Sequence, residues 1–141
     1  MADVGALKKE GNRLFQARQW RPAIDKYTSA IDLWMEPADR AVLYTNRAAC
    51  RLKLGEGHRA LSDAERAAAL APTYVKAHFR MAAALRQLSR PSEAVAALLR
   101  LLELAPEDAA AQQALKEAPA REVYMNEGRQ ERENAGIIGK I

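Results

Sequence analysis

The chain has 141 residues, of which 22 are basic and 18 are acidic, so its formal net charge is +4 at pH 7. This length suits one domain with a buried core, and so mild a positive charge does not indicate a nucleic-acid partner. Aromatic residues make up only 6% of the chain while alanine is abundant, which favours closely packed helices over a β-sheet.

The first predicted helix comes after a short N-terminal lead. Asp3 is positioned to cap this helix, which we expect to run to about Ala17. Gly11 lies in the middle of the helix, where glycine is less stable than alanine. We therefore expect Gly11 to mark a close approach by another helix.

The second predicted helix begins at Pro22, because a proline in the first helical turn loses no hydrogen bond. We expect this helix to end near Trp34, with Trp20 and Trp34 anchoring its two ends. Residues 35–39 then form a connection to the next helix that is longer than the corresponding connection later in the chain. The lengthening is expected to extend an outer loop without changing the phase of the later helices.

Further helices are predicted at about 38–54, 59–70 and 74–88, and from 91 or 92 to just before 106. A seventh helix comes next, with Glu107 and Asp108 in its first turn, where carboxylates suit the helix dipole. The proline at 119 should end or kink this helix near Ala118. Residues 119–141 are expected to form a charged helix or tail. For the apolar last residues, docking back, the start of a further domain and disorder all stay open.

These helices form pairs that repeat every 34 residues or so. Three units, at about 4–37, 41–74 and 75–108, fill most of residues 1–118. Shifted forward by 34, small residues of the second unit meet small or apolar ones in the third: Ala60, Ala64 and Ala67 fall on Ala94, Leu98 and Leu101. With a proline after the second helix, this spacing resembles the tetratricopeptide repeat (TPR). The resemblance implies an all-α, right-handed α-solenoid of three TPR helix pairs plus a C-terminal capping helix.

Polar side chains on the first helix of each unit share one helical face. When Gly11, Ala48 and Ala82 are aligned as one repeat position, five polar residues fall at positions related as i, i+3, i+4 and i+7. They are Lys8, Asn12, Asn46, Lys76 and Arg80. First helices line the concave surface of such a stack, so the five should converge. Three cations and two amide groups facing one groove predict a site for carboxylates.

Three segments carry a more specific resemblance. The runs LKKEGN (7–12), LYTNRAA (43–49) and KAHFR (76–80) are similar to the dicarboxylate-clamp class of co-chaperone TPR domains. Within this class, the run LYTNRAACRLK (43–53) and the lengthened first connection most resemble the N-terminal modules of UCS-type myosin chaperones and of mitochondrial-import co-chaperones. The resemblance implies a partner: the acidic Glu-Glu-Val-Asp tail of heat-shock protein 90, heat-shock protein 70 or both. Arg86 departs from the pattern of some clamp domains, so which chaperone is preferred stays open.

The same resemblance implies a role for each position. Lys8, Asn12 and Asn46 would bind the terminal carboxylate of the tail, and Lys76 and Arg80 would bind its last acidic side chain. A further basic position that assists the clamp is matched by Lys53. Apolar walls that include Phe15 and Phe79 would accept the residue before the last.

These residues also allow plainer interpretations. A lone lysine or asparagine on a helix is usually just solvated, and the same array could serve as a scaffold for an internal helix or another subunit. Cys50 is expected to be a buried structural thiol. His58 and His78 have no other metal-ligating residues spaced to bind a metal with them, so we expect neither a metal nor a cofactor. Because the sequence carries no catalytic constellation, signal peptide or membrane-spanning run, we expect a cytoplasmic protein that is not an enzyme.

Overall fold

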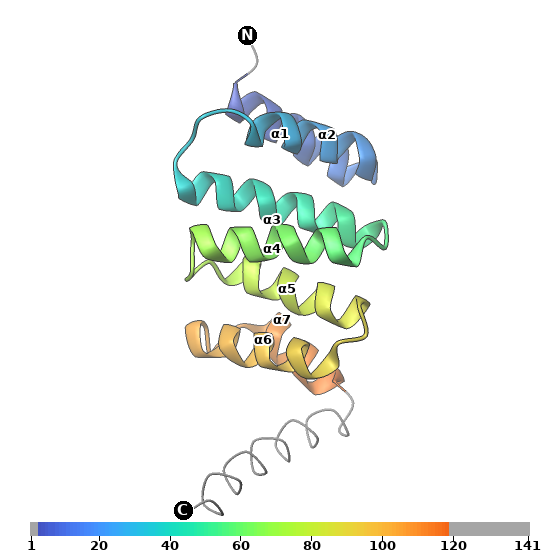
Figure 1. Cartoon of the computed structure of the whole chain (residues 1–141), viewed down its shortest axis with the longest axis vertical. Coiled ribbons are helices and arrows are strands. Elements are labelled where there is room, and N and C mark those ends of the chain that lie inside the picture. Colours follow the sequence, from blue (N-terminus) through green and yellow to red (C-terminus); the bar gives the residue numbers. More distant parts are fainter. Residues whose placement is uncertain (1–2, 119–141) are drawn as a thin grey trace, which may run out of the picture.

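The computed structural model describes residues 3–118, and the tail at 119–141 lies outside the described residues. Within this range the chain folds into helices alone, without a strand. The helices are α1 (Val4–Gln16), α2 (Trp20–Ile31), α3 (Pro37–Lys53), α4 (Gly57–Leu70), α5 (Val75–Gln87), α6 (Pro91–Leu104) and α7 (Ala109–Glu117). In Figure 1, α1 and α2 lie side by side at the N-terminal end, α3, α4 and α5 follow one below another, and α6 and α7 lie together at the other end.

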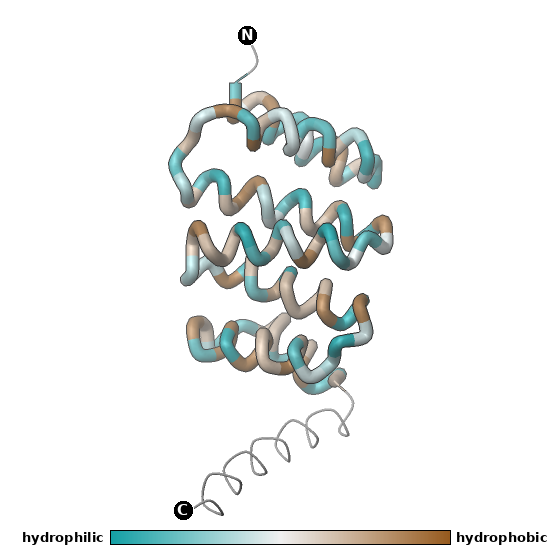
Figure 2. The backbone as a smooth tube through the Cα atoms, viewed as in Figure 1, coloured by the Kyte–Doolittle hydropathy of each residue, from teal (hydrophilic) through white to brown (hydrophobic). Residues whose placement is uncertain are grey.

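Each helix packs against the next one in the chain, and α3 also packs directly against α5. Apolar and polar residues recur in turn along the helices (Figure 2), at the helical spacing that lets a helix bury one face and expose the other. The buried faces are rich in alanine, which lets the helices approach closely. This is the α-solenoid of three helix pairs that the repeats predicted, with α7 packed against α6 at its end.

The glycine in α1 marks a close helix contact, as expected. A Cβ atom placed on Gly11 would lie 2.6 Å from Cε1 of Tyr27, whose side chain on α2 is fully buried. The expected cap of α1 is also confirmed, because Oδ1 of Asp3 accepts a hydrogen bond of 2.7 Å from the backbone N–H of Ala6.

The predicted start of α2 was wrong by two residues. The helix begins at Trp20, and its first backbone bond runs from the N–H of Ala23 to the carbonyl of Gln19. Pro22 is therefore the third residue of the helix, where its missing N–H still costs nothing. The ring of Trp20 packs edge-to-face on Phe15 of α1, with 5.1 Å between the ring centroids.

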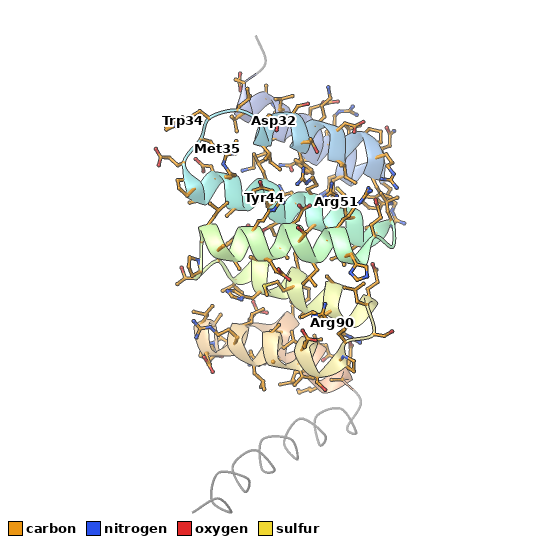
Figure 3. The ribbon with its side chains drawn as sticks, viewed as in Figure 1. Asp32, Trp34, Met35, Tyr44, Arg51 and Arg90 are labelled. Carbon is orange, nitrogen blue, oxygen red and sulfur yellow. The ribbon has the colours of Figure 1, made fainter. Side chains whose placement is uncertain are left out.

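The predicted end of α2 was also wrong, because the helix stops at Ile31 and not near Trp34. The guanidinium of Arg40 on α3 donates hydrogen bonds to the carbonyls of Ile31 at 2.5 Å and Leu33 at 3.1 Å, which satisfies the helix end. Trp34 is 81% exposed at the corner between α2 and α3 (Figure 3) and anchors nothing. We call residues 32–36 the α2–α3 corner.

The start of α7 differs from the prediction as well. Asp108 is its N-cap, and its carboxylate accepts a hydrogen bond of 2.8 Å from the backbone N–H of Ala111. Glu107 lies before the helix instead of in its first turn. The helix ends at Glu117, close to the predicted end.

The first helix of each pair ends in the same backbone turn. The residue after the helix cap has a positive φ in all three cases: Arg18 (59°), Gly55 (74°) and Ser89 (57°). The next N–H then bonds back to a carbonyl in the last helical turn, as from Gln19 to Leu14 at 2.9 Å. Glycine adopts this conformation freely, whereas arginine and serine do so at a cost.

A buried ionic cluster joins three helices. Arg47 of α3 donates two hydrogen bonds of 2.9 and 2.8 Å to the carboxylate of Asp63 on α4, and Arg51 adds a third of 2.8 Å. Arg47 also reaches the hydroxyl of Thr28 on α2 at 3.1 Å. Arg47 is 8% and Asp63 1% exposed, so this carboxylate is satisfied by its two arginines inside the protein.

Candidate functional site

The five residues of the predicted polar stripe line a single groove of about 370 Å³. They reach it from three elements: Lys8 and Asn12 from α1, Asn46 from α3, and Lys76 and Arg80 from α5. Within α1 and within α5 the two residues are four apart and so lie on one face. The charged residues of the groove lining are all cations, and no carboxylate is among them.

The amide of Asn12 is held by its neighbours. Its Oδ1 accepts a hydrogen bond of 2.6 Å from the hydroxyl of Tyr27 and a long one of 3.4 Å from Nδ2 of Asn46. Because the oxygen is engaged in this way, the amide nitrogen of Asn12 is left as a donor at the groove. The second helix of the first pair therefore orients a polar group on the first helix.

Arg80 is the most enclosed cation of the groove. Burial lowers the pKa of Arg80 from its usual value, although arginine stays charged at neutral pH. Its Nε lies out of contact with solvent and has no hydrogen-bond partner among residues 3–118. A buried donor on a cation is costly to leave unsatisfied. The same guanidinium lines the groove, where a carboxylate would meet a group suited to bind it.

The charge of the groove is not balanced by ion pairs among the residues that the structure describes. Within the described residues, the ion pairs include none of Lys8, Lys76 and Arg80. By contrast, Arg13, on the same helix as Lys8, pairs with Glu10 at 2.6 Å. The cations at the groove are therefore available to an anionic ligand.

Several residues of the groove lining were not predicted from the sequence: Gln16, Tyr27, Val42, Ala49 and Tyr74. Burial raises the pKa of both tyrosines above its usual value, so their hydroxyls keep their protons well beyond neutral pH. One signal could have located Tyr27, since the mid-helix glycine at position 11 requires a large neighbour. Tyr74 lies immediately before α5 and gave no comparable signal.

The remaining predicted site residues lie along the groove and beyond it. Phe15 lines the groove itself. Phe79 lines a second cavity of about 250 Å³ that also includes Lys76 and Arg80. Lys53 is not part of the groove lining: it lines a third cavity, of about 510 Å³, which adjoins the groove at Phe15.

Two other polar residues singled out in the sequence, Cys50 and His78, are buried in the protein. Cys50 is fully buried, and burial raises its thiol pKa to about 11. His78 is 9% exposed, with Nε2 2.8 Å from the carbonyl oxygen of Pro72. In the part of the chain that the structure describes, no cluster of three or more His, Cys, Asp or Glu residues could hold a metal ion. Nor is any helix between residues 3 and 118 long and apolar enough to cross a membrane.

This fold and groove define a helical-repeat module with a cationic concave site. No family model matches the chain. Among solved structures it is similar to the first TPR of Spaghetti (RPAP3) bound to the HSP90 peptide SRMEEVD, with a TM-score of 0.76 and 35% identity over 82% of this chain and 90% of that one. It is also similar to the Arabidopsis OM64 TPR domain, with a TM-score of 0.74 and 34% identity over 80% and 91% of the two chains. The chain therefore belongs to the tetratricopeptide-repeat family.

Longer proteins contain similar segments. The chain is 36% identical over 115 residues to protein unc-45 homolog B of Mus musculus, covering 82% of this chain and 12% of that protein. It is 37% identical over 110 residues to serine/threonine-protein phosphatase T of Trypanosoma brucei brucei, covering 78% and 22%. The crystal structure of the myosin chaperone UNC-45 from C. elegans in complex with an Hsp90 peptide matches with a TM-score of 0.78 and 31% identity over 90% and 14% of the chains. This chain thus spans 12% to 22% of the length of the two curated relatives.

Proposed function

We propose that this chain is a non-enzymatic binding module that holds the acidic C-terminal tail of heat-shock protein 90 or heat-shock protein 70 chaperones. The observation that carries the proposal is the groove, where three cations and two amides from three helices meet. Among residues 3–118 these cations have no ion pair and no carboxylate lines the groove. The similar TPR domains solved with Hsp90 and Hsp70 peptides support this choice of partner.

The proposed binding mode places an extended peptide along the groove. Lys8, Asn12 and Asn46 bind the terminal carboxylate, with Asn12 presented by its bond to Tyr27. Asparagine amides donate to the carboxylate while lysine supplies a point charge.

Lys76 and Arg80 bind the last acidic side chain in this mode. Arg80 is suited to this because it lines the groove, has no ion pair among residues 3–118, and carries a guanidinium that can bind a carboxylate through two N–H groups. Phe15 lies in the groove wall and Phe79 in the adjoining cavity, and both offer apolar surface to neighbouring peptide residues. Ordering a flexible tail offsets much of the attraction, so we expect micromolar affinity, about 8 kcal/mol.

Calorimetric titration tests the proposal. The unmodified chain should bind the peptides SRMEEVD and SGPTIEEVD, and Lys76→Glu or Arg80→Ala should abolish binding without unfolding the domain. Matched controls are Lys9→Glu, which changes an exposed lysine beside Lys8 that does not line the groove, and Arg100→Ala, which removes an exposed arginine of α6. Both controls should bind as tightly as the unmodified chain.

Two further titrations separate a carboxylate clamp from a general scaffold. Amidating the C-terminus of the peptide should weaken binding nearly as much as the groove substitutions do. Rising salt should also weaken binding, because the contacts are mostly between charges. Equal affinity for the free and amidated peptides would reject the clamp and favour a scaffold that recognises internal segments.

A further inference from the structure

The α2–α3 corner presents a large aromatic side chain to solvent. Trp34 is 81% exposed, and the only other exposed large apolar side chain between residues 3 and 118 is Leu99, at 43%. Figure 3 shows Trp34 at the outer edge of the molecule, and it lines none of the three cavities described above. A single exposed apolar residue is common on protein surfaces, so the surroundings of Trp34 decide whether it has a role.

The backbone that carries Trp34 is held on both sides. The next residue, Met35, is 8% exposed and belongs to the same buried cluster as Ile31 of α2. The residue before it, Leu33, accepts a hydrogen bond on its carbonyl from the guanidinium of Arg40. The indole therefore stands on an ordered corner, and a partner that covers it would restrict the corner little further. Tryptophan is among the residues that contribute most often to binding energy at protein interfaces.

Three exposed carboxylates lie close to this tryptophan in the chain. Asp32 and Glu36 are two residues to either side of it, and Asp39 is in the first turn of α3. Among the residues that the structure describes, none of the three is in an ion pair. Residues 32–40 have a net charge of −2 even with Arg40 included, although the whole chain has +4. The corner is thus an acidic region of a basic protein.

An exposed indole close to exposed carboxylates favours a cationic ligand. A guanidinium or ammonium group placed over an aromatic face is attracted to it, and tryptophan attracts it most strongly. Carboxylates attract the same groups and can accept two parallel hydrogen bonds from an arginine. A neutral apolar partner would use the ring but not the carboxylates, and an acidic partner would be repelled. The charge of the corner therefore favours a basic segment over both of these.

We infer that the α2–α3 corner is a second interaction surface, which binds a basic segment of a partner protein. An arginine or lysine of that segment stacks on Trp34, and Asp32, Glu36 and Asp39 attract the neighbouring cations. Trp34 does not line the central groove, so a partner at the corner leaves the groove open. One chain can then hold an acidic ligand in its groove and a basic partner at its corner. This inference does not depend on which ligand the groove binds.

A nuclear magnetic resonance titration tests the surface, with the side-chain N–H signals of the two tryptophans as the readout. The Trp34→Ala variant identifies which signal belongs to Trp34 and which to Trp20. The probe is the peptide GRGRGRGRG, acetylated and amidated at its ends so that it offers no free carboxylate to the groove. It should shift the signal of Trp34 and leave that of Trp20 in place, and rising salt should weaken its binding.

Two sets of variants separate the corner from the rest of the surface. Trp34→Ala should weaken binding of this peptide, followed by the backbone signals of residues 32–40, by about two- to fivefold, as for an exposed cation–π contact. Leu99→Ala removes the other exposed apolar side chain and should bind as the unmodified chain does. Asp32→Asn combined with Glu36→Gln should also weaken binding.

The matched charge control for that double variant is Glu107→Gln combined with Glu117→Gln, which removes two exposed carboxylates elsewhere and should have little effect. An unshifted Trp34 signal at millimolar peptide would overturn the inference. An equal response to the uncharged peptide GSGSGSGSG would also overturn it, because the corner would then be a plain apolar patch. A Trp34 signal that shifts with protein concentration alone would assign the corner to a second copy of this chain and reject a basic partner.

Discussion

The hydroxyl of Tyr27 on α2 donates a 2.6 Å hydrogen bond to Oδ1 of Asn12 on α1. Tyr27 is 1% exposed, so a residue buried between the two helices sets the orientation of an amide at the groove. The packing of the first helix pair and the chemistry of its concave face therefore depend on one side chain.

Tyr27→Phe should weaken peptide binding while leaving the fold intact. Loss of one hydrogen bond of this kind is worth about 0.5 to 1.5 kcal/mol, so we expect the dissociation constant for SRMEEVD to rise by about two- to tenfold. Tyr44→Phe is the control, because Tyr44 lies on α3 outside the groove lining. An unchanged affinity in Tyr27→Phe would show that the orientation of Asn12 does not matter.

Gly11→Ala should destabilise the domain although alanine is the better helix former. The new Cβ would lie 2.6 Å from the ring of Tyr27, and overpacking of this kind outweighs a gain in helix propensity of about 1 kcal/mol. We expect a loss of roughly 1 to 2 kcal/mol in urea unfolding. Gly5→Ala is the comparison, since its Cβ would meet only the Asp3 carboxylate, at 3.3 Å. A stabilised Gly11→Ala variant would contradict the close helix contact.

Asp63→Asn should unfold the protein more readily than any surface charge change. It would leave the positive charges of Arg47 and Arg51 without their carboxylate, and breaking a buried pair in this way costs about 3 to 5 kcal/mol. Glu103→Gln removes a carboxylate that is 67% exposed and pairs with Arg100, and should change stability by less than about 0.5 kcal/mol. Urea denaturation of the two variants measures the difference, and equal losses would mean that the cluster contributes little.

Cys50 should make the stability of the domain fall at high pH. Burial raises the thiol pKa from 9.0 to about 11 in the folded chain, so between these values the unfolded chain loses its proton while the folded chain keeps it. The unfolded state then binds fewer protons, and stability decreases as pH rises. The stability difference between the unmodified chain and Cys50→Ala should thus be constant below pH 9 and shrink from pH 9 to 11. A constant difference across this range would exclude a buried neutral thiol.

The helices and the groove residues could be predicted from the sequence for a simple physical reason. Each repeat needs a small residue where its two helices cross, and aligning Gly11, Ala48 and Ala82 fixes the phase of every other position. All three are buried. Once the phase is known, the face that carries Lys8 or Arg80 can be deduced from helical geometry alone.

The features that the sequence did not reveal depend on contacts between distant residues. Arg47 and Asp63 look like ordinary solvated charges on separate helices, and only the packing of α3 on α4 makes them a buried pair. The apolar residues after Ile31 continue a helical pattern, yet Arg40 ends the helix there by binding its carbonyls. The position of Lys53 beyond the central groove likewise depends on where α3 ends.

The guanidinium of Arg40 also determines how the molecule tolerates added length. Its hydrogen bonds to the carbonyls of Ile31 and Leu33 end α2 before the α2–α3 corner. The extra residues of the first repeat therefore lie in this corner and do not lengthen the helix. The exposed Trp34 at this bend supports no other part of the domain. This corner is therefore a natural attachment point for a fluorescent dye or an affinity label that leaves the central groove undisturbed.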